Sequence, residues 1–243
     1  MKTTLLFLSV FLSATLFGQN VYVPDANFKA CLVGNSEINT NGDTEIQVSE
    51  ASVFNGAIYC WNQNISDLTG IEAFTALTYL DCSLNQLTSL DLSQNVALEI
   101  LVCFENQIIN IDITQNTALE YLNCSLNQLT SLDVTQNTAL EYLYCSWTQL
   151  TNLDVSQNTA LTELECGFNQ LTSLDVSHNT ALTVLYCGYN QLTNLDVSQN
   201  TALTLLLCHH NYMLFHRCNP EHQQLPLPRI VLLLFDQIHW QQM

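Results

Sequence analysis

Eight cysteines recur at a nearly fixed spacing along the chain. Cys60 and Cys82 are 22 residues apart, and each later cysteine as far as Cys208 lies 21 residues after the one before it. Such thiols could form disulfides or bind a metal. However, side chains at the same place in neighbouring repeats run parallel, whereas a tetrahedral metal site needs ligands that converge. We therefore predict free, buried thiols that pack as small apolar side chains.

The cysteines belong to a repeated unit in which leucine and asparagine also keep fixed places. The unit that begins at Leu119 reads L-x-x-L-x-C-x-x-N-x-L-x-x-L. Inward asparagines after each strand can satisfy backbone groups that the bend leaves unpaired. This asparagine ladder consists of Asn85, Asn106, Asn127, Asn169, Asn190 and Asn211. Thr148 takes the asparagine's place in one unit, so we expect a local weak point there.

The unit resembles a leucine-rich repeat with cysteine at a position usually held by leucine, and the resemblance covers roughly residues 60–211. The chain is similar to secreted bacterial proteins of the internalin type and to repeat proteins exported by type IX secretion. This resemblance implies an α/β-type repeat solenoid, an arc with a parallel concave β-sheet, an irregular convex side and a small helical N-terminal cap. It also implies cell adhesion or protein binding outside a Gram-negative bacterium or on its surface. A series of Asp and Asn residues, such as Asp112 and Asn116, is assigned to turns on the convex side.

Strand alternation places several aromatic and acidic side chains on the open face of this sheet. The candidate ligand-binding residues are Tyr121, Tyr142, Tyr144, Trp147, Glu163, Glu165 and Tyr186. Tyrosine and tryptophan dominate binding hot spots, so these residues favour recognition of an extracellular protein or glycan. The column that contains Trp147 could instead pack against its neighbours at the sheet edge. The sequence shows no catalytic constellation, and we predict that the chain is not an enzyme.

Two other functions stay open at this point. The chain could be a spacer without a specific ligand, or a calcium-dependent component of a surface layer. A calcium role rests on the segment before the repeats. There, residues 39–50 resemble the twelve-residue EF-hand loop. The matching positions are Asn39, Asn41, Asp43, Glu45, Gln47 and Glu50. Asn39 and Thr44 depart from the EF-hand pattern, so a plain turn and a weak calcium site both remain open. No cofactor is required.

Composition divides the chain and limits its partners. Residues 1–18 are predicted to form a signal peptide, residues 19–59 the cap and residues 60–211 the solenoid. A short helix from Asp25 is expected to turn Phe28, Cys31 and Leu32 toward the core of the cap.

Four Lys and Arg residues against 22 Asp and Glu residues give a charge of -18, which disfavours nucleic acid as a partner. No apolar run is long enough for a membrane span, and we expect a monomer.

The tail, residues 212–243, loses the repeat and gains proline, histidine and arginine. Read one nucleotide later, the codons of His216 to His222 permit Ile-Asp-Val-Thr-Gln-Asn-Thr, the motif of residues 111–117. Arg217 also lies 21 residues after Asp196, which keeps the register. We predict that a frameshift near Asn211 produced this tail, with a divergent cap as the alternative. The nucleotide sequence tests the prediction, since a +1 frame without repeat codons contradicts it.

Overall fold

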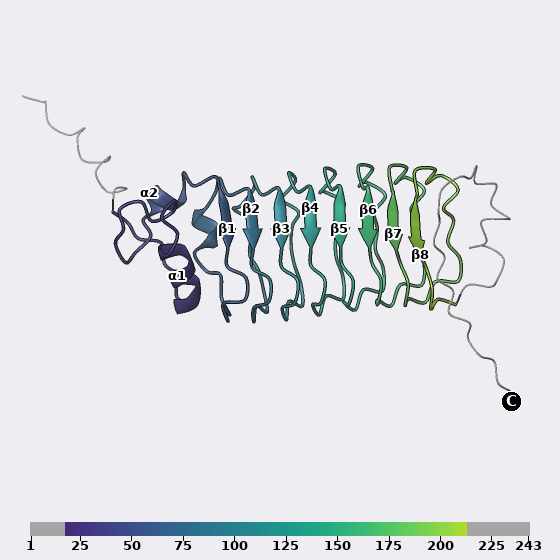
Figure 1. The fold of residues 1–243 in the computed structure, drawn as a ribbon, viewed down its shortest axis with the longest axis horizontal. Coiled ribbons are helices and arrows are strands. Elements are labelled where there is room, and N and C mark those ends of the chain that lie inside the picture. Colours follow the sequence, from purple (N-terminus) through teal and green to yellow (C-terminus); the bar gives the residue numbers. More distant parts are fainter. Residues whose placement is uncertain (1–17, 213–243) are drawn as a thin grey trace, which may run out of the picture.

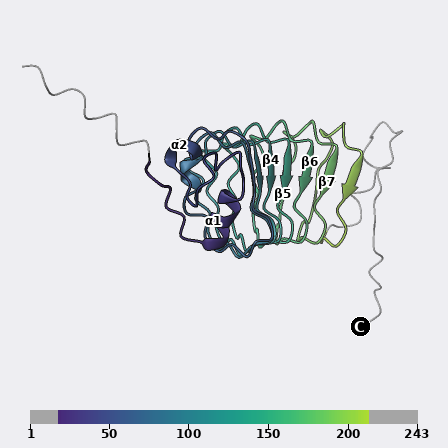
Figure 2. The same cartoon turned by 60° about the vertical axis from the view of Figure 1, so that its left-hand side comes forward.

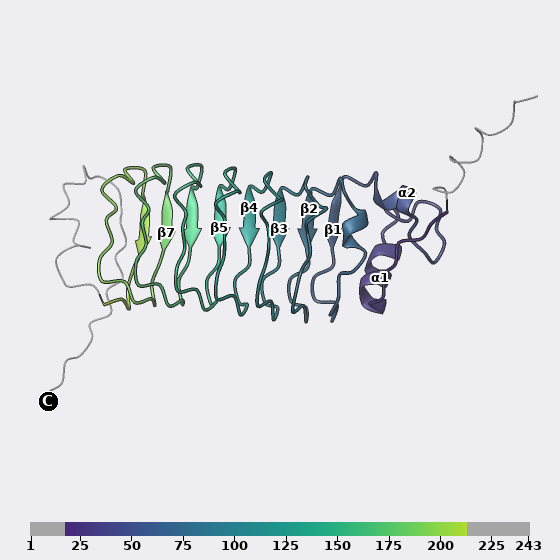
Figure 3. The same cartoon turned by 180° about the vertical axis from the view of Figure 1, so that it is seen from behind.

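The computed structural model describes residues 18–212, and its core is one parallel sheet of eight strands (Figure 1). The strands are β1 Ala57–Tyr59, β2 Tyr79–Asp81, β3 Ile100–Val102, β4 Tyr121–Asn123, β5 Tyr142–Tyr144, β6 Glu163–Glu165, β7 Val184–Tyr186 and β8 Leu205–Leu207. Each strand pairs in register with the next, and irregular segments return behind the sheet (Figure 3). The predicted leucine-rich-repeat solenoid is confirmed.

The stack of coils buries the leucines and cysteines that the repeat frame turns inward. In every strand from β2 to β8 the central residue is buried and its two neighbours are half-buried. The cysteine ladder from Cys82 to Cys208 is buried and free of disulfides. Burial raises the pKa of the thiols of Cys82, Cys103, Cys124, Cys145 and Cys166, and the pKa of Cys166 rises to about 12. The thiols therefore stay protonated and act as apolar filling.

The asparagine ladder joins each coil to the one before it. Asn127 Nδ2 donates to the carbonyls of Cys103 and Cys124, both at 3.0 Å, and Asn127 Oδ1 accepts from Ile108 N–H at 2.9 Å. On the return side, Asn116 Nδ2 donates to the carbonyls of Leu92 and Asn95. The amides thus satisfy backbone groups that the bends would leave unpaired.

The cap covers the N-terminal end of the stack with two short helices, α1 Ala26–Val33 and α2 Val48–Ala51 (Figure 2). Asp25 caps α1 by accepting from the N–H groups of Asn27 and Phe28, and it also accepts from Ser66 in the first coil. Phe28 and Leu32 are fully buried, as the sequence predicts. A 3-10 turn, η1 Ile71–Ala73, lies between β1 and β2.

The structure corrects two expectations about the cap. Cys31 is bonded to Cys60 in a disulfide with a Cα–Cα distance of 5.9 Å, so it is not a free core thiol and Cys60 is not part of the free ladder. The physical reason is that Cys60 lies in the first coil, which has the cap rather than another coil on its outer side. The sheet also begins at Ala57, inside the segment assigned to the cap.

The predicted signal peptide and the predicted frameshifted tail lie outside the described residues, except for their inner ends, Gly18 and Tyr212. Among residues 18–212, the helices are all too short or too polar to cross a membrane.

Thr148 interrupts the asparagine ladder. Its hydroxyl lies 3.0 Å from the Cys145 carbonyl and 2.6 Å from Asn169 Oδ1. Elsewhere in the ladder, the amide also accepts a backbone N–H from the preceding coil. At this place, that group is Leu129 N–H, and no such bond forms to Thr148 within the described chain.

We therefore expect Thr148→Asn to raise the free energy of unfolding by about 1–2 kcal/mol, since it restores two hydrogen bonds to the preceding coil. Equilibrium urea denaturation measures the change. Asn127→Thr is the matched control and should lower the stability by a similar amount. If Thr148→Asn leaves the midpoint unchanged while Asn127→Thr lowers it, the weak point at Thr148 does not exist.

Candidate functional site

The outward residues of β2 to β8 form a continuous surface, which we term the strand face. These residues are Tyr79, Asp81, Ile100, Val102, Tyr121, Asn123, Tyr142, Tyr144, Glu163, Glu165, Val184, Tyr186, Leu205 and Leu207. All are half-buried because each lies beside its neighbours on adjacent strands. Six of the seven candidate binding residues lie on this face, and Trp147 lies beside it.

Three tyrosines on β4 and β5 form a cluster near the middle of the strand face. The ring centroid of Tyr121 lies 5.9 Å from that of Tyr142 and 5.3 Å from that of Tyr144, with tilted planes. Such tilted ring pairs add to the stability of the surface and hold the rings in place. The cluster therefore offers preformed apolar area with polar hydroxyl groups at its edge.

Two carboxylates follow the cluster on the next strand. Tyr144 Oη donates a hydrogen bond to Glu163 Oε2 at 2.7 Å. Burial and the charge of Glu163 raise the pKa of Glu165, while burial and the hydrogen bond to Glu163 raise the pKa of Tyr144 above its usual range. Burial, followed by Tyr189 and Glu165, raises the pKa of Tyr186 to about 12. The two carboxylates thus place negative potential among the rings.

Trp147 belongs to a separate row of rings at the edge of the sheet, which we term the edge stack. Its members are Trp147, Phe168, Tyr189 and His210. Successive ring centroids lie 3.7, 4.0 and 4.2 Å apart, with nearly parallel planes. Each of these residues has a positive φ of 53–56°, a backbone conformation that side chains other than glycine rarely adopt. The packing that the sequence left as an alternative is therefore the arrangement of Trp147.

The first coil adds aromatic residues that the sequence reasoning missed. Tyr59 is 59% exposed and Trp61 is 50% exposed. The ring of Tyr59 packs on that of Tyr79, with a centroid distance of 4.9 Å. The signal was available in the repeat frame. Ile58 and Cys60 occupy the inward positions that Leu122 and Cys124 hold in a later coil. Tyr59 therefore occupies the outward position that corresponds to Asn123.

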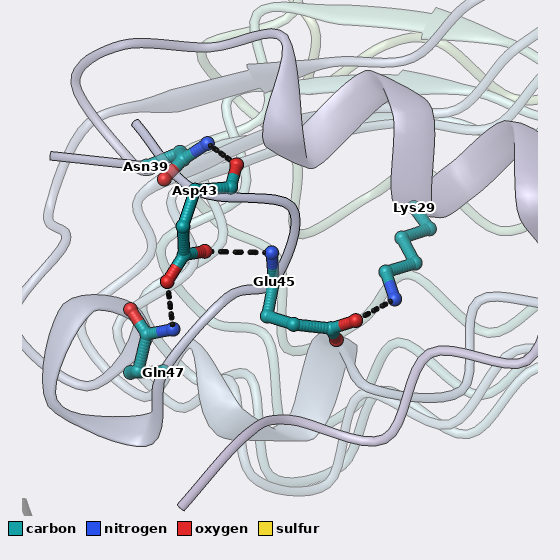
Figure 4. Close-up of polar contacts among 5 residues, drawn as sticks. All are labelled: Lys29, Asn39, Asp43, Glu45 and Gln47. Carbon is teal, nitrogen blue, oxygen red and sulfur yellow. Dashed lines mark hydrogen bonds and ion pairs between the residues drawn. The ribbon is translucent and has the colours of Figure 1, made fainter. Parts of the chain in front are cut away.

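The candidate calcium residues lie in the cap loop, where their side chains bond mainly to one another and to the loop backbone (Figure 4). Asn39 Nδ2 donates to the Asp43 carbonyl at 2.8 Å, and the Asp43 carboxylate accepts from Glu45 N–H at 2.7 Å and from Gln47 Nε2 at 3.0 Å. Glu45 pairs with Lys29 Nζ at 2.6 Å.

The remaining two members of that set complete the loop. Asn41 Oδ1 accepts from Asp43 N–H, and Glu50 accepts from the N–H groups of Thr40 and Gln47. Hydrogen bonds from Gln47 and Thr40 lower the pKa of Glu50 against the opposing effect of its burial. A calcium ion would have to compete with these contacts, so the calcium assignment stays a prediction.

Comparison with known proteins adds the family context. The family described as the leucine-rich-repeat domain of the endo-beta-N-acetylglucosaminidase EndoS matches residues 43–158. Internalin J of Listeria monocytogenes is 45% identical over 77 residues, which make up 31% of this chain and 8% of that protein. The matched relative therefore extends far beyond the part that is shared.

Solved structures carry the same fold. The functional domain of InlJ from Listeria monocytogenes, described as including a cysteine ladder, is 33% identical with a TM-score of 0.53, over 85% of this chain and 55% of that one. An internalin C2 of the same species has a TM-score of 0.67 at 18% identity, over 88% and 94% of the two chains, and supports the fold alone. With its repeat frame, parallel sheet and buried cysteine ladder, the chain is an internalin-like leucine-rich-repeat protein.

Proposed function

We propose that this protein is an extracellular binding or adhesion module that recognises a protein or glycan through the strand face. The observation that carries the proposal is the cluster of Tyr121, Tyr142 and Tyr144, whose rings are held by one another on an open surface. Large aromatic side chains are unfavourable on a surface without a partner, because part of their apolar area stays in contact with water.

Binding fits this surface better than catalysis. Glu163 and Glu165 are alternate residues of one strand, so they project side by side from the sheet. A glycosidase instead places its two carboxylates on opposite sides of the bond that is cleaved. We therefore infer no reaction at this pair.

The proposal also places the protein outside the cell, in keeping with the predicted signal peptide. The disulfide between Cys31 and Cys60 supports this location, since structural disulfides persist in oxidising compartments. We infer a monomer that is exported to the surface or surroundings of a Gram-negative bacterium.

An array of glycans and secreted proteins tests the proposal. We expect wild-type protein to retain a ligand that Tyr142→Ala, Tyr144→Ala loses, with binding at least about tenfold weaker, because the anchor rings are gone. Trp147→Ala is assayed separately, since Trp147 belongs to the edge stack.

A matched control removes exposed apolar side chains elsewhere. Tyr22, Val96 and Ile109 are 74%, 52% and 62% exposed and lie off the strand face. Their replacement by alanine should leave binding intact. Thermal melts check folding. Leu143→Ala should lower the free energy of unfolding by about 2–5 kcal/mol, because it opens a core cavity. Equal binding by wild type and the double tyrosine variant would favour a spacer without a specific ligand.

Calcium binding by the cap loop is tested by thermal melting. A weak site should stabilise the folded cap by RT ln(1 + [Ca²⁺]/Kd), about 0.4 kcal/mol when calcium equals its Kd. We expect this gain in wild type and in Glu99→Gln, but not in Asp43→Asn, Glu50→Gln. A melting temperature that ignores millimolar calcium, or rises equally in all three proteins, would show that the loop is only a turn.

A further inference from the structure

The carboxylate pair lies between tyrosines on the strand face. Pairing of β6 with its neighbours puts Glu165 in register with Tyr144 on one side and Tyr186 on the other. Adjacent strands are about 4.8 Å apart, so both rings lie within contact distance of a group bound at Glu165. Glu163 lies on the same face, one row away.

No lysine or arginine side chain of the described chain neutralises this pair. Lys29 is the only Lys or Arg among residues 18–212, and it pairs with Glu45 in the cap. The Tyr144 hydroxyl donates to Glu163, but a neutral donor leaves the charge in place. Two adjacent carboxylates in a half-buried setting are unfavourable until a cation joins them.

The surroundings of Tyr186 are shaped by two glycines. A Cβ added to Gly167 would lie 2.7 Å from the Tyr186 ring, and one added to Gly188 would lie 3.0 Å from it. These positions hold serine or a larger side chain in the earlier coils, for example Ser125 and Phe104. The missing side chains let the ring settle against the backbone beside Glu165.

Ser146 lies two residues after Tyr144, just past the end of β5. It is 5% exposed, and its buried hydroxyl oxygen has no hydrogen-bond partner within the described chain. Its residue position is diagonal to Glu165, and diagonal neighbours lie about 7–8 Å apart, which is within reach of a planar group with several donors.

We propose that Glu163 and Glu165, flanked by Tyr144 and Tyr186 and supported by Ser146, dock an arginine side chain of a protein partner. A guanidinium group presents five donors in a plane, so it can bond a carboxylate through two of them while its face packs on a tyrosine ring. The inference rests on the proposed binding function and deepens it, because it selects a protein ligand with a basic segment. The net charge of -18 favours encounter with such a segment.

A divalent cation fits the pair less well. Calcium takes six to eight oxygen ligands, and in the described part of the chain no third acidic, histidine or cysteine side chain joins Glu163 and Glu165 in a group that could hold a metal. The observations therefore favour the guanidinium.

The test uses an acetylated and amidated peptide, Gly-Ser-Arg-Gly-Arg-Ser-Gly, and its citrulline counterpart, which keeps the shape but loses the charge. Fluorescence anisotropy measures binding of the labelled peptides to the full chain. We expect the arginine peptide to bind at least about tenfold more tightly than the citrulline peptide. Glu163→Gln, Glu165→Gln should remove about tenfold of that affinity.

The matched control is Glu99→Gln, Glu120→Gln, which removes the same charge from exposed positions outside the strand face. Its affinity should stay within about twofold of wild type, because distant surface charges contribute little to a local contact. Thermal melts should show the Glu163 and Glu165 variant folded and at least as stable as wild type, since it relieves like-charge repulsion.

The outcomes separate this inference from the proposed function. Absence of arginine-peptide binding, equal binding of the citrulline peptide, or equal losses in both glutamate variants would overturn the arginine site. An array ligand that needs Tyr142 and Tyr144 but tolerates Glu163→Gln, Glu165→Gln would also overturn it, while leaving the binding function standing. A glycan ligand of this kind would be one such case.

Discussion

The structure depends on one constraint, which is that a single 21-residue coil cannot bury its own apolar face. Leu122 and Cys124 are covered only because equivalent residues lie above and below them in the adjacent coils. The parallel in-register pairing of the strands makes this stacking continuous. Every coil therefore repeats the same inward pattern, and the side chains that point outward are free to vary without loss of the core.

The same constraint governs the polar groups. Each bend would leave backbone donors and acceptors unpaired inside the stack, and the Asn ladder satisfies them across the coil boundary. Among residues 18–212, the first coil has the cap in place of a preceding coil. At the N-terminal end the cap takes that role through α1, through the bond from Ser66 to Asp25, and through the disulfide to Cys60.

The outward side chains can vary without loss of the core, so a binding site can form from them. The strand face carries tyrosines on β4 and β5, carboxylates on β6 and a further tyrosine on β7, held in register by the sheet. The scaffold fixes the spacing between these side chains at the strand separation, so they can be arranged in advance for a partner. This rigidity lowers the ordering cost that binding must overcome.

The sequence by itself determined the fold and the direction of most side chains. A period of 21 residues gives each position the same place in every coil, and alternation along the strand then decides that Leu143 is inward and Tyr144 outward. The same reasoning extends to Tyr59. Only the tertiary structure decided the contacts between segments that no repeat relates. The disulfide joins Cys31 to a member of the ladder, because the cap happens to cover that coil. The edge stack of Trp147 and Phe168 depends on a left-handed backbone turn, and the bond from Tyr144 to Glu163 depends on how two side chains lean across the sheet. Periodicity specifies which way a residue points, but the distances between side chains follow from packing in three dimensions.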